Sequence, residues 1–256
     1  ALIAFVQMDL KKVLAYSTMS QLAYIFTGLG AALFLANALN WHDPSYAGYD
    51  KNKTIVIVAF GAALFHLFNH AMAKGMLFMA SGSVIHEMHH AHHDVHHHDH
   101  GDEDDHHGHD DHHDDFDAQS MANMGGLASR LPITATAMLV GSASIIGLPL
   151  IGGFWSKEGI IANTWRVAVE HDPRFLLPAF LVLITAGMTG FYMSRMWFMT
   201  FAGKPKTEVA AHVHEQTPWI PIPLLVLIPM SLGGIVFASM KVTKYLGYNG
   251  KQLDMN

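Results

Sequence analysis

Long apolar runs separated by short polar connections constrain the fold of this 256-residue chain more than any other feature. The sequence is 51% hydrophobic and only 14% charged, whereas soluble domains carry about 25% charged residues. About 20 helical residues cross the hydrocarbon core of a bilayer, and the ten-residue alternation typical of membrane barrels is missing from the sequence. We therefore predict an all-α, polytopic transmembrane helix bundle. The expected spans are 13–38, 54–86, 131–148, 175–201 and 218–240, after a truncated helix end at 1–8.

One predicted span is interrupted. The segment "GLPLIGGFWSKEG" places Gly147, Pro149 and the pair Gly152–Gly153 in an otherwise apolar region. Backbone that leaves the helical form inside a membrane must be satisfied by protein or by a water-filled cavity. We predict a broken helix near 147–157.

Charge is distributed unevenly along the chain. Segment 86–117 carries twelve Asp and Glu and no Lys or Arg, so the remainder of a chain with net charge −6 carries +6. We predict transmembrane helices in 1–86, a His/Asp-rich extramembrane loop over 87–130, further transmembrane helices including the broken one in 131–240, and a truncated extramembrane tail at 241–256. Because the chain starts inside an apolar run, we expect a fragment of a longer protein.

The stretch "ALFHLFNHAMAKGMLF" holds three ionisable residues inside a predicted span: His66, His70 and Lys74. Their i, i+4, i+8 spacing places them in one stripe on a helix. A charge at the bilayer centre costs at least about 2.5–3.5 kcal/mol, so such groups face a polar interior. One interpretation is packing, with neutral histidines and a lysine whose ammonium reaches the interface. A second is a metal site on the HxxxH face. The third, which we favour, is a proton relay, because imidazole titrates near neutrality and a lysine removed from water exchanges its proton readily.

Three further charges are candidates. Lys157 and Glu158 follow the Gly/Pro interruption, where a charge can either reach an internal cavity or lie at the membrane interface. Asp9, together with the lysines that follow it, reads from sequence as a helix-end cluster. Arg195 is expected to serve packing or to reach the interface.

The loop sequence "HEMHHAHHDVHHHDHGDEDDHHGHDDHHDDFD" is of low complexity and cannot form an apolar core. It is compatible with a solvated insertion, with binding of a divalent metal such as Zn²⁺, Ni²⁺ or Cu²⁺, or with a surface proton antenna. Metal transporters often carry such loops, which makes that class a rival. No metal ligand is assigned firmly. The candidates within the loop are His89, His93, His97, His106 and His112.

The composition also excludes several classes. The chain has no Cys, so disulfides and Cys-ligated zinc or iron–sulfur sites are excluded. It has no dinucleotide-binding fingerprint, and we expect no redox cofactor in this chain. It also lacks the basic stripe typical of nucleic-acid binding.

Several long motifs together resemble one family. "DLKKVLAYSTMSQLAYIFTGLG", "ALFHLFNHAMAKGMLFMASGSVIH", "NMGGLASRLPITATAMLVGSASIIGLPLIGGFWSKEGII" and "FYMSRMWFMTFAGK" are similar to the antiporter-like membrane subunits of respiratory complex I, specifically the L-type (chain 5) subunit. The large subunit of multi-subunit Na⁺/H⁺ antiporters belongs to the same family. The resemblance covers nearly the whole chain outside 87–117.

The resemblance implies an inverted-repeat antiporter-like fold in a prokaryotic cell membrane. It implies proton translocation, driven by redox chemistry at NADH, FMN, Fe–S clusters and quinone in partner subunits. The alternative within the family is the Na⁺/H⁺ antiporter subunit. By resemblance, Lys74 is a buried relay lysine and Lys157 is the lysine beside the broken helix. By the same resemblance, His66 and His70 match the family's histidine pair, which links the two half-channels. Glu158 takes the acidic position that follows the lysine, and Asp9 matches the acid of a D-[IL]-K-[KR] motif.

Overall fold

The computed structural model describes residues 1–40, 43–45, 48–98, 116–149, 151–215 and 219–232, without the side chains of 96–98. In these ranges the regular structure is helical, and strand-like pairing is confined to one bridge between Asp9 and Ser120. The helices are α1 (Leu2–Val6), α2 (Leu10–Ala38), α3 (Tyr49–His98), α4 (Pro132–Ile146), α5 (Gly152–Glu170), α6 (Leu176–Phe201), α7 (Glu208–His212) and α8 (Pro221–Leu232), with 3₁₀ turns η1 (Leu127–Ser129) and η2 (Pro173–Phe175). This confirms the predicted all-α bundle.

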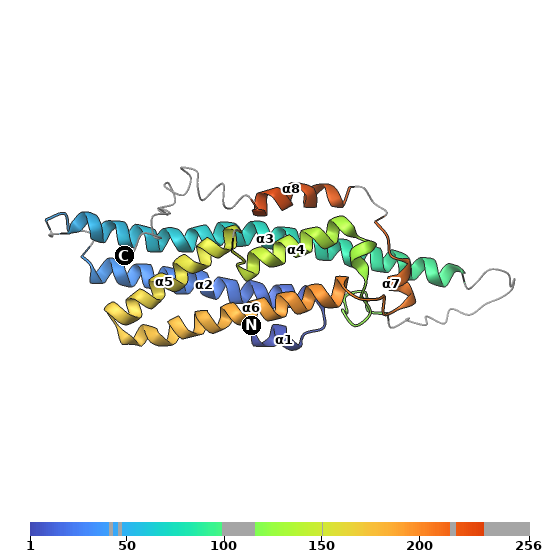
Figure 1. Ribbon diagram of the computed structural model, residues 1–256, viewed down its shortest axis with the longest axis horizontal. Helices are drawn as coiled ribbons and strands as arrows, with labels where there is room; N and C mark the ends of the chain where they lie inside the picture. Colours follow the sequence, from blue (N-terminus) through green and yellow to red (C-terminus); the bar gives the residue numbers. More distant parts are fainter. Residues whose placement is uncertain (41–42, 46–47, 99–115, 150, 216–218, 233–256) are drawn as a thin grey trace, which may run out of the picture.

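The long helices α2, α3 and α6 run side by side, and α4 and α5 follow each other along the bundle (Figure 1). α2, α3 and a segment containing α6 are long and apolar enough to cross a membrane, while α4 and α8 are shorter apolar helices. The outward side of α6 exposes large apolar side chains such as Leu177, Leu181 and Phe191. This exposure suits a surface that faces lipid or neighbouring subunits.

The interruption between α4 and α5 follows from glycine chemistry. Gly147 ends α4 in the left-handed conformation (φ 83°), and its N–H donates to the carbonyl oxygens of Ala143 and Ser144. Glycine adopts this conformation without the steric cost that a Cβ imposes. At the start of α5, a Cβ built on Gly153 would lie 1.9 Å from the carbonyl oxygen of Ser144. The two half-helices therefore cross closely where the sequence supplies glycine.

α4 begins at Pro132, and its N-terminus is completed from a distant segment. No side chain of the preceding residue caps it. Instead the Glu215 carboxylate accepts hydrogen bonds from the backbone N–H and the hydroxyl of Thr134, both at 3.1 Å. An acidic group at a helix N-terminus also interacts favourably with the helix dipole. Glu215 thus fixes the segment after α7 to the start of α4.

Two boundaries differ from the sequence-based expectation. The helix expected over 54–86 spans Tyr49–His98, because Met88 and Ala91 remain buried in the main apolar core and continue its packed face. α2 begins at Leu10 rather than at residue 13, because Asp9 caps it. Of the span expected over 218–240, residues 219–232 are described, and α8 occupies all of them after the turn at 219–220. The expected tail at 241–256 and residues 99–115 of the loop lie outside the described residues.

Candidate functional site

The ionisable stripe of α3 lies inside the bundle. His66, His70 and Lys74 are 2%, 7% and 5% exposed. The imidazole centroids of His66 and His70 are 6.4 Å apart, and the Lys74 ammonium donates to the carbonyl oxygen of Leu14 on α2 at 3.0 Å. The helical spacing therefore directs all three side chains toward neighbouring helices and away from the outer surface of the bundle.

Lys157 enters the same interior from the first turns of α5. Its ammonium donates to the carbonyl oxygen of Ile145 at 2.7 Å, and the carbonyl of Ile146 lies at 3.5 Å. These carbonyls belong to the last turn of α4, where the unpaired oxygens and the helix dipole favour a cation. The ammonium also lies 5.1 Å from the ring centroid of Tyr24, within cation–π range. The break between α4 and α5 thus exposes the carbonyl oxygen that accepts a hydrogen bond from the Lys157 ammonium.

His66 connects three helices. Its Nδ1 lies 2.9 Å from the Ser156 hydroxyl on α5, and its Nε2 lies 3.2 Å from Oε1 of Gln21 on α2. Both partners are fully buried. His70, one turn further along α3, has an Nε2 without a hydrogen-bond partner among the described residues. A buried imidazole nitrogen of this kind is available to exchange a proton.

A chain of buried polar side chains was missed at the sequence level. Gln21 Nε2 lies 3.4 Å from the Thr189 hydroxyl, which accepts a further hydrogen bond from Tyr192. The Tyr192 hydroxyl also contacts Ser17 and Ser20, both at 3.1 Å. The signal was present in "STMSQLAY", where the polar positions of α2 recur at helical spacing. Those positions are Ser17, Ser20, Gln21 and Tyr24.

The bundle thus places two lysines and two histidines in its interior, beside the break between α4 and α5. A profile described as "NADH:quinone oxidoreductase/Mrp antiporter, TM" matches residues 1–40 and 51–189. The chain belongs to this family. It is therefore an integral membrane protein of the antiporter-like class, as the motifs predicted.

Named relatives agree with this placement. "NAD(P)H-quinone oxidoreductase chain 5" of Synechocystis sp. is 40% identical over 203 residues, covering 79% of this chain and 22% of the relative. The chloroplastic "NAD(P)H-quinone oxidoreductase subunit 5" of Anthoceros angustus is 38% identical over 218 residues, covering 85% of this chain and 22% of the relative. The chain thus spans less than a quarter of the length of these relatives.

Among solved structures, the Mrp complex from Dietzia sp. DQ12-45-1b contains a chain with a similar fold. The TM-score is 0.53 at 14% identity, over 91% of this chain and 46% of the other. This similarity supports the antiporter-like fold.

Glu158, which the resemblance matched with the acid after the relay lysine, lies apart from the buried stripe. Its side chain is exposed, whereas that of Lys157 is buried. Both nevertheless line one cavity of about 660 Å³ beside α5, together with Trp165 and Arg166. Glu158 therefore lies at the exposed side of the cavity that Lys157 lines from within.

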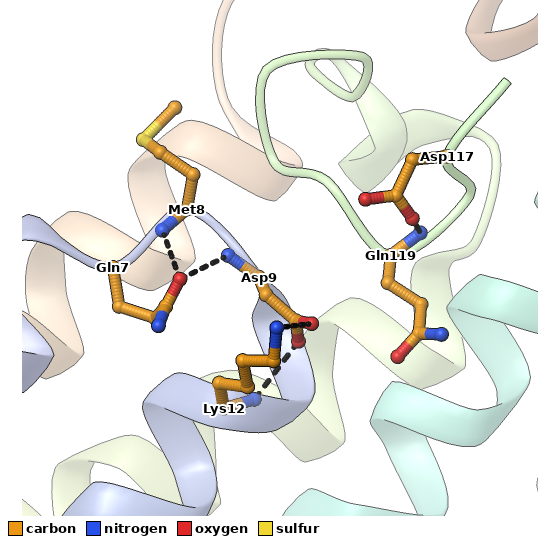
Figure 2. A network of polar contacts seen from close by, with 6 residues as sticks. All are labelled: Gln7, Met8, Asp9, Lys12, Asp117 and Gln119. Atoms are coloured by element: carbon orange, nitrogen blue, oxygen red, sulfur yellow. Dashed lines mark hydrogen bonds and ion pairs between the residues drawn. The ribbon is translucent and has the colours of Figure 1, made fainter. Parts of the chain in front are cut away.

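Asp9, which the resemblance matched with the acid of a D-[IL]-K-[KR] motif, is the N-cap of α2. Its carboxylate accepts the backbone N–H of Lys12 at 2.9 Å and forms an ion pair with the Lys12 ammonium at 3.5 Å (Figure 2). The amide oxygen of Gln7 accepts the N–H of Asp9. Arg195 donates to the carbonyl oxygen of Gln7 at 2.8 Å, so it holds the corner between α1 and α2. The structure does not join Asp9 to the stripe.

The histidine candidates of the loop divide into two groups. His89 and His93 lie exposed on the last turns of α3. The side chain of His97, and all of His106 and His112, fall outside what the structure describes. Within the described part of the chain, no three His, Asp or Glu side chains come together as a metal site. The metal interpretation of the loop therefore gains no support.

Proposed function

We propose that this chain is part of a proton-translocating membrane subunit of a complex I-like NAD(P)H:quinone oxidoreductase. The observation that carries the proposal is the set of four basic side chains that are buried together in the interior of the helix bundle: His66, His70, Lys74 and Lys157. A membrane protein that only needed to pack would place apolar residues there, because each isolated charge costs at least about 2.5–3.5 kcal/mol.

The geometry gives each lysine a separate holding position. Lys74 is held by a carbonyl of α2 and Lys157 by a carbonyl of α4. The two histidines precede Lys74 on α3, and His66 contacts Ser156, the residue before Lys157. The set is continuous in space, because the Lys157 ammonium lies 5.1 Å from the ring centroid of Tyr24 and that centroid lies 6.0 Å from the one of His66. Because like charges repel strongly where water is scarce, charging one lysine favours release of a proton elsewhere along the set. A charge shift in a neighbouring subunit can therefore move protons along it.

In this proposal the chain itself carries no redox chemistry. NADH, FMN, Fe–S clusters and quinone belong to partner subunits, and this chain contacts other membrane subunits. The lack of Cys agrees with that division, since Fe–S clusters are held mainly by Cys thiolates.

The second candidate is the large subunit of a multi-subunit Na⁺/H⁺ antiporter. Two findings support this candidate: the fold is similar to that of a chain of the Mrp complex, and the family description includes the Mrp antiporter. The two candidates differ in their partners, because an antiporter has no redox arm.

Isolation of the native complex tests the proposal. The complex that contains this chain is purified from solubilised membranes, and its subunit masses and its Fe–S and flavin spectra are recorded. Iron–sulfur and flavin signals, with NAD(P)H-driven proton uptake in vesicles, are expected. An assembly of membrane subunits without redox centres would support the antiporter instead. A small oligomer carrying zinc would favour a metal transporter.

A further inference from the structure

The hydrogen bonds around His66 determine which of its nitrogens exchanges a proton. The residues involved are His66, Gln21, Thr189 and Ser156, and all four are at most 2% exposed. In such an interior each donor needs an acceptor and each acceptor needs a donor. The positions of the hydrogens can therefore be worked out from the contacts.

The starting point is Thr189. Its hydroxyl oxygen lies 2.7 Å from the carbonyl oxygen of Thr185. Two oxygens approach this closely only with a hydrogen between them, and only the hydroxyl can supply it. The Thr189 oxygen is therefore an acceptor toward all its other neighbours.

This fixes the amide of Gln21. The group that faces Thr189 at 3.4 Å must be a donor, so it is the Nε2 amide nitrogen. The Gln21 Oε1 oxygen then faces His66, 3.2 Å from Nε2 of the imidazole. Because an amide oxygen only accepts, His66 Nε2 carries a hydrogen in every charge state. The nitrogen that gains and loses a proton is Nδ1.

Ser156 lies at that second nitrogen with one hydroxyl hydrogen and two possible acceptors. Its oxygen is 2.9 Å from His66 Nδ1 and 3.1 Å from the carbonyl oxygen of Gly153. When His66 is neutral, the hydroxyl donates to Nδ1. When His66 is charged, Nδ1–H donates to the hydroxyl oxygen, and the hydroxyl hydrogen turns to Gly153.

We propose that Gln21 and Thr189 hold His66 in the Nε2–H form, and that Ser156 is a positioning residue whose hydroxyl turns between His66 and Gly153 as a proton arrives and leaves. The N–H bond at Nδ1 forms as an N–H or O–H bond of a neighbouring donor in the relay breaks, and the reverse exchange occurs when the proton leaves. Gly153 lies in the first turn of α5, one helical turn before Lys157. The charge of His66 is thereby transmitted to the half-helix that carries the lysine. This inference rests on the proposed proton translocation.

Other groups face His66 as well. They are His70 on α3, the Tyr24 ring on α2 with its centroid at 6.0 Å, and, on the Tyr24 ring in turn, the Lys157 ammonium of α5. On α6 the nearest link is Thr189 through Gln21. The variants tested next leave His70, Tyr24 and Lys157 unchanged. A change in the pH dependence of proton uptake is therefore assigned to the hydrogen bonds that link Thr189, Gln21 and His66.

The first test compares Thr189→Val with Thr189→Ser in the full-length protein within its complex. Proton uptake into inverted membrane vesicles is measured with a pH-sensitive dye from about pH 6 to 9, the range around neutral imidazole chemistry, with quinone reduction recorded alongside. Valine removes the hydroxyl at similar volume and frees the Gln21 amide to turn. We expect the pH midpoint of uptake to move in Thr189→Val and to stay at the wild-type value in Thr189→Ser. An effect on packing alone would lower uptake by the same factor at every pH and would overturn the proposal.

The second test compares Ser156→Ala with Ser142→Ala. Ser142 is also buried, and its hydroxyl has no hydrogen-bond partner among the described residues. We expect Ser156→Ala to lower proton uptake per quinone reduced by at least about tenfold, because His66 Nδ1 loses its buried hydrogen-bond partner, and Ser142→Ala to retain it. Equal behaviour of the two variants, with uptake intact in the wild type, would overturn this inference alone. A wild-type complex that moves no protons would overturn the proposed function and the inference together.

Discussion

The Lys157 ammonium donates to the carbonyl oxygen of Ile145 at 2.7 Å, across the break between α5 and α4. One contact therefore joins the two half-helices and holds the most deeply placed cation of α5. The carbonyl belongs to a helix C-terminus, which provides partial negative charge without an acidic side chain. A lysine held in this way can release its proton without leaving a buried carboxylate uncompensated.

Replacement of Lys157 tests whether this contact serves transport. In the full-length protein, Lys157→Ala should leave the complex assembled and lower proton uptake per quinone reduced by at least about tenfold, because a positioned proton carrier is lost. Lys204→Ala, which removes an exposed lysine, is the matched control. Assembled Lys157→Ala complex that pumps like the control would remove Lys157 from the proton path.

Lys74→Met is the corresponding test on α3. Methionine has a similar length and is accommodated well in apolar interiors, but it cannot donate to the Leu14 carbonyl or carry a proton. We expect assembly to persist and proton uptake to fall by a factor similar to that for Lys157→Ala. The measurement is dye-detected uptake normalised to quinone reduction. Uptake equal to wild type would indicate that Lys74 only packs against α2.

The sequence was sufficient for the helical class, the break and the buried stripe. Span length, the positions of Gly147 and Pro149, and i, i+4 spacing depend only on local order along the chain. The end of α3 could not be predicted in this way, because the His-rich composition hides the burial of Met88 and Ala91 against other helices. The contacts of His66 depend on the rotation of three helices, α2, α3 and α5, relative to one another. Sequence spacing gives the face of one helix but not the partner that meets it.

Gly153→Ala tests the close crossing of α4 and α5. The new Cβ would lie 1.9 Å from the Ser144 carbonyl oxygen and 2.9 Å from its carbon. Because these are backbone atoms, the half-helices must separate, and we expect destabilisation by at least about 1–3 kcal/mol. The thermal midpoint and the yield of assembled complex measure it. Gly187→Ala, where nothing lies within 4 Å of the added carbon, is the control. Equal midpoints for the two variants would contradict the crossing.

Variants of Asp9 distinguish a structural role of its side chain from a role in proton transport. As the N-cap of α2 it accepts the backbone N–H of Lys12, and loss of such a cap costs about 0.5–2 kcal/mol. Asp9→Ala should therefore lower the thermal midpoint of the complex. Asp9→Asn keeps the cap and removes the charge, so we expect it to restore the midpoint and to retain proton uptake. If Asp9→Asn were stable and yet failed to pump, the carboxylate would act in transport, because the cap would then be intact and only the charge would be missing.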